Sequence, residues 1–123
     1  MKKKILFVDN TESFLGIISD ILRENGYLVK PFNKVSEAMH YIENGGNYDF
    51  ALFDYDFGNA RYDGEDLLNL SVDKNKDVPV IMLSSYANGN QNRFYKARYF
   101  LNYGSKDLAK DLVDTLDNHF KFE

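Results

Sequence analysis

Five short apolar runs are spaced along the chain and predict buried strands. They lie at residues 4–8, 27–32, 50–54, 79–85 and 98–102. Apolar runs of this length without polar alternation are typical of a parallel sheet, because its strands are covered on both faces. Pro31, near the end of the second run, cannot donate a backbone hydrogen bond and therefore favours an edge position for that strand.

Between and after these runs, apolar residues recur three or four positions apart, which indicates helices. The predicted helices lie at 14–26, 36–46, 64–70 and 105–120. Gly26 and the Gly45–Gly46 pair are placed to end the first two, and we expect Ser105 to cap the last. Strands that alternate with helices over short connections predict an α/β fold, with an open parallel sheet and helices on both faces.

Polar residues follow three of the predicted strands at the point where each leaves the core. Asp9 and Asn10 follow the first strand, Asp54 and Asp56 the third, and Ser84 lies at the end of the fourth. Open α/β sheets bind ligands beyond the carboxyl ends of their strands. If the first, third and fourth strands are neighbours, these polar groups converge on one small acidic site.

Two close carboxylates repel each other, so such a site requires a proton or a cation. Oxygen ligands favour Mg²⁺, which binds through one or two carboxylates and commonly shares its site with a phosphate. A carboxylate beside Mg²⁺ and a hydroxyl can accept a phosphoryl group, since the metal and the hydroxyl stabilise the charge on the transferring oxygens.

At this point the sequence resembles the receiver domains of two-component response regulators. The matching pieces are residues 5–14, 48–58 with Asp63–Gly64, 78–85 and 96–101, in the family's order along nearly the whole chain. The resemblance implies a flavodoxin-like (CheY-like) five-stranded parallel sheet of strand order 2-1-3-4-5, with a short or irregular fourth helix between Ser84 and Phe100. It also implies that residues 1–123 form a single receiver domain.

The resemblance assigns a role to each polar residue of the site. Asp54 is expected to be the phosphoacceptor and Asp9 to hold Mg²⁺ through water, whereas Asp56 is expected to offer the metal its backbone carbonyl. Ser84 is expected to bind the phosphoryl group and shift when it arrives. Phe100 occupies the position of the family's switch aromatic.

Two departures from the family pattern affect the site. Asn10 stands where the family usually has a second metal-binding acid, which predicts weaker Mg²⁺ binding. The family's lysine, which contacts the phosphoryl group, has no single counterpart. The strand pattern places Asn102 or Tyr103 there, whereas counting from Ser84 places Lys106 there.

Composition narrows the class of protein further. The net charge of −4 argues against nucleic-acid binding, and no apolar run is long enough for a signal peptide or a membrane span. With no cysteine in the chain, we expect a cytoplasmic protein without disulfides. The expected partners are a sensor histidine kinase or phosphotransfer protein and a downstream effector protein or domain. We do not expect an enzyme that turns over a free substrate.

Two other functions fit parts of the sequence. A pseudo-receiver would keep the fold, dispense with phosphorylation and act as a protein-docking module, which Asn10 and the uncertain position of the lysine favour. A phosphatase of the haloacid dehalogenase type would use Asp54 and Asp56 as nucleophile and acid, but that family usually carries this pair on its first strand. In the plainest interpretation, Asp54 and Ser84 are strand-end polar residues that bind nothing.

Overall fold

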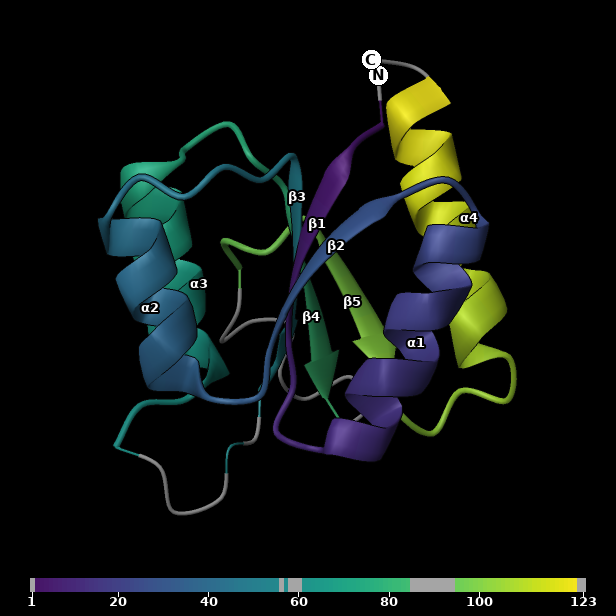
Figure 1. The fold of residues 1–123 in the computed structure, drawn as a ribbon, viewed down its shortest axis with the longest axis horizontal. Helices are drawn as coiled ribbons and strands as arrows, with labels where there is room; N and C mark the ends of the chain where they lie inside the picture. Colours follow the sequence, from purple (N-terminus) through teal and green to yellow (C-terminus); the bar gives the residue numbers. More distant parts are fainter. Residues whose placement is uncertain (1, 56, 58–60, 85–94, 122–123) are drawn as a thin grey trace.

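The computed structural model describes residues 2–55, 57, 61–84 and 95–121, and it contains a five-stranded parallel sheet between two pairs of helices (Figure 1). The strands are β1 Lys4–Val8, β2 Leu28–Phe32, β3 Phe50–Asp54, β4 Val80–Ser84 and β5 Tyr99–Asn102. The helices are α1 Glu12–Glu24, α2 Val35–Glu43, α3 Gly64–Lys74 and α4 Leu108–Lys121.

The strand order is β2-β1-β3-β4-β5, which confirms the flavodoxin-like topology predicted from the sequence. All residues of β3 and β4 are buried, as the uninterrupted apolar runs predicted. β2 lies at an edge and is largely exposed, in agreement with the position of Pro31. The central position of β3 places its carboxyl end between those of β1 and β4.

Alternate side chains of each strand enter two separate cores. On one face, α2 and α3 cover the sheet, and on the other α1 and α4 do (Figure 1). The α2/α3 core includes Leu6, Val8, Phe53, Leu67 and Met82. The α1/α4 core includes Phe7, Leu22, Leu52, Leu83 and Leu112.

Most helix boundaries follow the sequence signals, with one correction. Gly26 and Gly45 have positive φ angles of 93° and 77° just beyond α1 and α2, a conformation that glycine adopts without strain. Ser105, however, does not cap α4. The helix begins at Leu108, and the Ser105 hydroxyl instead donates to the Asp111 carboxylate at 2.6 Å.

The expected short fourth helix falls mostly on residues 85–94, which lie outside the described residues. None of the helices in the described ranges is both long and apolar enough to span a membrane.

Candidate functional site at the carboxyl edge of the sheet

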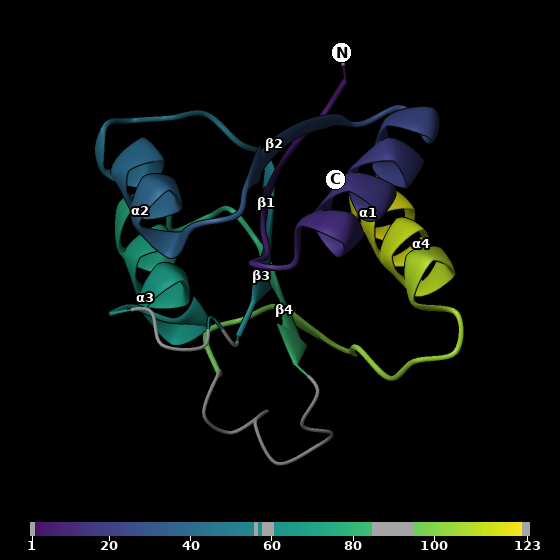
Figure 2. The ribbon, with the colours of Figure 1, turned by 60° about the horizontal axis from the view of Figure 1, so that its bottom comes forward.

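The carboxyl edge of the sheet gathers three buried polar side chains from adjacent strands. Asp9, Asp54 and Ser84 are 0%, 4% and 6% exposed, although polar residues of these types usually lie at the surface. Figure 2 brings this edge forward and shows the ends of β1, β3 and β4 close together. The convergence expected from the sequence is therefore present in the fold.

Asp9 and Asp54 are neighbours because their strands pair in register. Val8 is opposite Phe53, so Asp9, which directly follows β1, lies beside Asp54, the last residue of β3. The Asp9 backbone N–H donates to the Phe32 carbonyl at 3.0 Å, which continues the sheet ladder past the end of β1. Two buried acids are thus held at one place by backbone hydrogen bonds rather than by flexible loops.

Both carboxylate oxygens of Asp9 accept hydrogen bonds. Oδ1 accepts from the Thr11 backbone N–H at 2.9 Å, and Oδ2 accepts from the Tyr103 hydroxyl. Burial raises the pKa of Asp9 above its usual value, and the bonds from Tyr103 and Thr11 partly offset that rise. The acid expected to hold Mg²⁺ therefore already has two donors.

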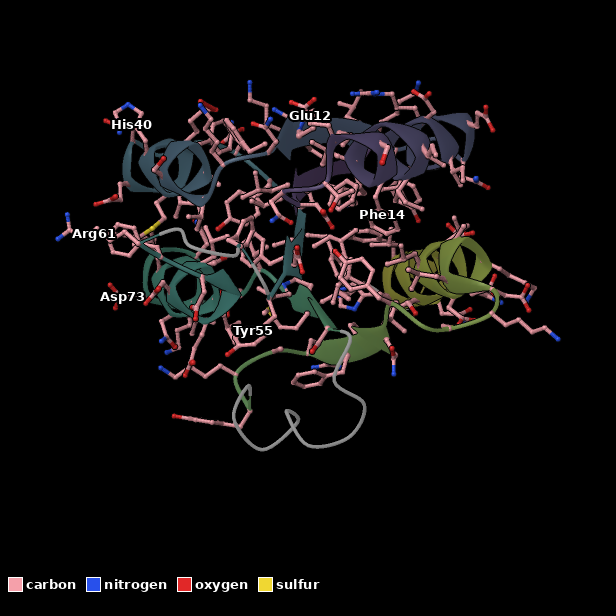
Figure 3. All side chains as sticks on the ribbon, turned by 90° about the horizontal axis from the view of Figure 1, so that it is seen from below. Glu12, Phe14, His40, Tyr55, Arg61 and Asp73 are labelled. Atoms are coloured by element: carbon pink, nitrogen blue, oxygen red, sulfur yellow. The ribbon has the colours of Figure 1, made fainter. Side chains whose placement is uncertain are left out.

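Tyr103 is the residue directly after β5, and its side chain reaches the acids. Its ring packs edge-on against Phe14 of α1, with centroids 5.1 Å apart and planes at 66°, and Phe14 in turn contacts Phe7 at 6.1 Å. Figure 3, seen from the carboxyl edge, shows Phe14 on the side of the sheet covered by α1 and α4. This aromatic contact helps to hold the Tyr103 hydroxyl at the acidic site.

Tyr103 also interacts with Asp54. Burial, the hydrogen bond to Asp9 and the negative charge of Asp54 together hold the pKa of Tyr103 far above its usual value. The phenol is therefore neutral at physiological pH and acts as a hydrogen-bond donor. Of the positions that the sequence left open for the family's lysine, the structure brings Tyr103 to the two acids.

The backbone of Asp54 is fixed from the opposite side by the start of α3. A Cβ on Gly64 would lie 2.2 Å from the Asp54 carbonyl oxygen, and the Gly64 N–H donates to the Tyr55 carbonyl at 3.0 Å. Asp63 caps α3 by accepting from the backbone N–H groups of Glu65 and Asp66. The Asp63–Gly64 pair, which is among the pieces that resemble the family, thus sets the position of the phosphoacceptor candidate.

Ser84 of β4 and Phe100 of β5 lie on paired strands, but Ser84 lies beside the acids and Phe100 packs against the α2/α3 core. The Ser84 carbonyl accepts from the Tyr103 N–H at 3.2 Å, so the ends of β4 and β5 are joined beside the acids. Phe100 is half-buried, is opposite Met82 and packs against the α2/α3 core. Phe100 and Tyr103 therefore extend from β5 to opposite faces of the sheet.

The remaining candidates are exposed or lie outside the described part. Asn10 is exposed, and so is Lys106, in the turn before α4. No salt bridge between Lys106 and Asp9 or Asp54 is found among the described residues. Asp56 lies outside the described ranges, and within those ranges no three acidic or histidine side chains cluster as metal ligands.

The donor set at this edge suits a hard divalent cation. Asp9 and Asp54 supply two buried carboxylates, and the Tyr103 hydroxyl and the Thr11 backbone N–H donate hydrogen bonds to Asp9. Oxygen ligands with this charge fit Mg²⁺ better than a softer metal. The sequence offered Tyr103 as one of several residues at the position of the family's lysine. It could not select Tyr103, because alternation along a strand predicts which face a side chain is on but not which groups it contacts.

Comparison with known proteins agrees with this architecture. The family model for the response regulator receiver domain matches residues 5–113. The two-component response regulator ARR12 of Arabidopsis thaliana is 34% identical over 85 residues, which are 68% of this chain and 14% of that protein. The chain thus spans about one seventh of that relative's length.

Solved structures show the same fold at lower identity. A CheY-like receiver domain protein from Methanospirillum hungatei has a TM-score of 0.85 at 23% identity, covering 98% of this chain and 95% of the other. TrrA from Thermotoga maritima, crystallised with Mg²⁺ and BeF, has a TM-score of 0.78 at 24% identity, covering 94% and 99%. With the family match over most of its length, this chain belongs to the response regulator receiver domain family.

Proposed function

We propose that this receiver accepts a phosphoryl group on Asp54 with the help of Mg²⁺ and thereby changes a partner-binding face. The observation that carries the proposal is the buried Asp54 carboxyl group at the end of the central strand, beside Asp9 and next to the strand that ends in Ser84. Nothing in the packing of an apolar core requires two acids there, and burying them costs free energy.

In the proposed reaction, an Asp54 carboxylate oxygen forms a bond to the phosphorus of the donor. The bond from phosphorus to the donor's leaving atom breaks, and its electron pair departs with the leaving group. In this proposal the Ser84 hydroxyl would donate to a phosphoryl oxygen. Bound Mg²⁺ would neutralise charge on the phosphoryl oxygens, with Asp9 and Asp54 as the residues that hold it.

The site also suggests how phosphorylation reaches a partner. Ser84 is joined to β5 through the hydrogen bond from the Tyr103 N–H, and Phe100 belongs to the same strand. Movement of Ser84 toward a phosphoryl group would therefore act on β5 and on the packing of Phe100. Family membership supports a histidine kinase or phosphotransfer protein as the donor and an effector as the receiver of the signal.

A pseudo-receiver is the second candidate, because one observation favours it. The Tyr103 hydroxyl donates to the Asp9 oxygen Oδ2 and interacts with Asp54, so the acids are partly satisfied without a metal. In this alternative the acidic site is structural, and the protein acts by docking. On neither candidate does the protein turn over a free substrate as an enzyme.

Phosphorylation by a small-molecule donor separates the two candidates. The protein is incubated with acetyl phosphate and Mg²⁺, and its intact mass is measured beside Asp54→Asn and the exposed-acid control Asp73→Asn. The proposal predicts one added phosphoryl group on the native protein and on Asp73→Asn, and none on Asp54→Asn. A native protein that stays unmodified would favour the pseudo-receiver, and a modified Asp54→Asn would show that another residue is the acceptor.

A further inference from the structure

The Tyr103 hydroxyl interacts with both buried acids that the proposed function assigns to Mg²⁺. The Tyr103 hydroxyl donates to Asp9 Oδ2 and also interacts with Asp54. We propose that the Tyr103 hydroxyl competes with Mg²⁺ for Asp9, so that this tyrosine sets the cation affinity of the site. The inference rests on the proposed function, since it concerns the cation that phosphorylation of Asp54 requires.

The competition follows from the geometry of Asp9. Thr11 already donates to Oδ1, so Oδ2 is the Asp9 oxygen that the Tyr103 hydroxyl engages. A carboxylate oxygen has two lone pairs, and the Tyr103 hydroxyl takes one of those on Oδ2, so a metal ion or a metal-bound water would have to share this buried oxygen with the hydroxyl. A cation at Oδ2 withdraws negative charge from the oxygen that accepts this hydrogen bond, so we expect the Tyr103 hydroxyl to weaken or lose its bond as the cation binds.

A phenol is a weak substitute for a cation at this position. It is neutral and carries one proton, so it can serve one acceptor at a time, whereas the two acids together present up to two negative charges. The hydroxyl therefore stabilises the cation-free site without neutralising it. A divalent cation remains favourable, but its binding is opposed by the loss of one hydrogen bond to a charged group.

The packing around Tyr103 allows the hydroxyl to be removed alone. The ring contacts Phe14, and that contact belongs to the ring and not to its oxygen. Tyr103→Phe therefore keeps the packing between α1 and β5 and deletes the competing donor. Tyr99 of β5 offers a matched control, because its hydroxyl pairs with His119 Nδ1 at 3.1 Å, and among the described residues no hydrogen bond joins it to Asp9 or Asp54.

The test is a titration of Mg²⁺ into the native protein, Tyr103→Phe and Tyr99→Phe by isothermal calorimetry at fixed ionic strength. A hydrogen bond to a charged group corresponds to roughly tenfold or more in an equilibrium constant, so Tyr103→Phe should bind Mg²⁺ about tenfold more tightly. Tyr99→Phe should bind like the native protein. A substitution that only loosened the fold would weaken Mg²⁺ binding. The predicted tighter binding therefore cannot result from damage to the fold.

A second readout uses the native protein alone and does not depend on how the variants fold. The Cζ carbon resonance of Tyr103, assigned in protein labelled at tyrosine, should move as Mg²⁺ is added, while that of Tyr99 stays in place. Unchanged or weaker Mg²⁺ binding by a folded Tyr103→Phe, or a stationary Tyr103 resonance on a protein that binds Mg²⁺, would overturn the competition and leave the proposed function standing. Absence of Mg²⁺ binding by both the native protein and Tyr103→Phe would overturn both.

Discussion

Gly64 lies directly against the backbone of Asp54, so the first residue of α3 sets the position of the proposed phosphoacceptor. A Cβ built on Gly64 comes within 2.2 Å of the Asp54 carbonyl oxygen and 2.7 Å of the Tyr55 Cα. Both neighbours are backbone atoms of the sheet edge, and the Tyr55 N–H is itself bonded to the Leu83 carbonyl at 2.9 Å. Neither atom can give way without disturbing β3.

Gly64→Ala should therefore damage both the fold and the site. We expect the free energy of unfolding to fall by about 1–3 kcal/mol, as for other overpacked positions, and the rate of phosphorylation by acetyl phosphate to fall with it. Gly16→Ala is the control, since Gly16 lies in α1 with nothing within 4 Å of an added Cβ, and it should stabilise the protein by about 0.5–1 kcal/mol. Urea denaturation of both variants measures the difference, and equal stabilities would contradict the contact.

Asp9 should reduce the stability of the metal-free protein at neutral pH. Its folded pKa is raised, so the native state binds the proton more tightly than the unfolded chain does. The contribution of Asp9 to stability is therefore greatest below its unfolded pKa and is lost as the pH rises through its folded pKa. With a folded pKa well below 7, the Asp9 carboxyl group is ionised at pH 7, and its stabilising contribution is then fully lost.

Asp9→Asn should accordingly raise the free energy of unfolding at pH 7 in the presence of EDTA, while abolishing most Mg²⁺ binding. The gain should shrink as the pH is lowered toward the unfolded pKa of aspartate. Exposed Asp77→Asn serves as the control and should show little change. An Asp9→Asn protein less stable than the native one at pH 7 would mean that the hydrogen bonds from Thr11 and Tyr103 outweigh the cost of burial.

The position of Asp9 and Asp54 could be predicted from sequence, because each ends an apolar run and parallel strands end at the same edge. The partner of the acids was narrowed to alternatives, of which the strand pattern gave Asn102 or Tyr103 and counting gave Lys106. Counting residues from Ser84 to Lys106 assumed a connection of fixed length, whereas the pairing of Ser84 with Asn102 places Tyr103 as the next residue at the edge. The prediction that Ser105 caps α4 was wrong because a serine near the start of a helix can bond to a side chain instead of the backbone.

Asn10→Asp should tighten Mg²⁺ binding. Asn10 follows Asp9 and is exposed at the rim of the site. A negative charge at position 10 would therefore attract Mg²⁺ partly through solvent. We expect a gain of about 1 kcal/mol, or roughly fivefold in Kd, from Coulomb attraction at intermediate dielectric. Asn69→Asp, an exposed position on α3, is the control and should leave the Kd unchanged. Equal affinities of Asn10→Asp and the native protein would place residue 10 outside the metal's surroundings.

Binding of a phosphoryl mimic at the site should also change the surroundings of the residues in β5. Beryllofluoride with Mg²⁺ mimics a phosphoryl group, and we expect it to change the amide resonances of Ser84 and of residues 99–103 as well as those beside Asp54. The reason is the hydrogen bond that joins the Ser84 carbonyl to Tyr103 and the packing of Phe100 on the same strand. Changes confined to residues 9, 10, 54 and 55 would show that the site does not act on this strand.

The central claim is that Asp54 is the phosphoacceptor, and mapping the modified residue tests it most directly. After incubation with acetyl phosphate and Mg²⁺, the acyl phosphate is reduced with borohydride, which converts the phosphorylated aspartate to homoserine, and the peptides are sequenced by tandem mass spectrometry. The account predicts homoserine at position 54 and unmodified aspartate at positions 9 and 56. Homoserine at either of those positions, or at none of the three, would contradict it.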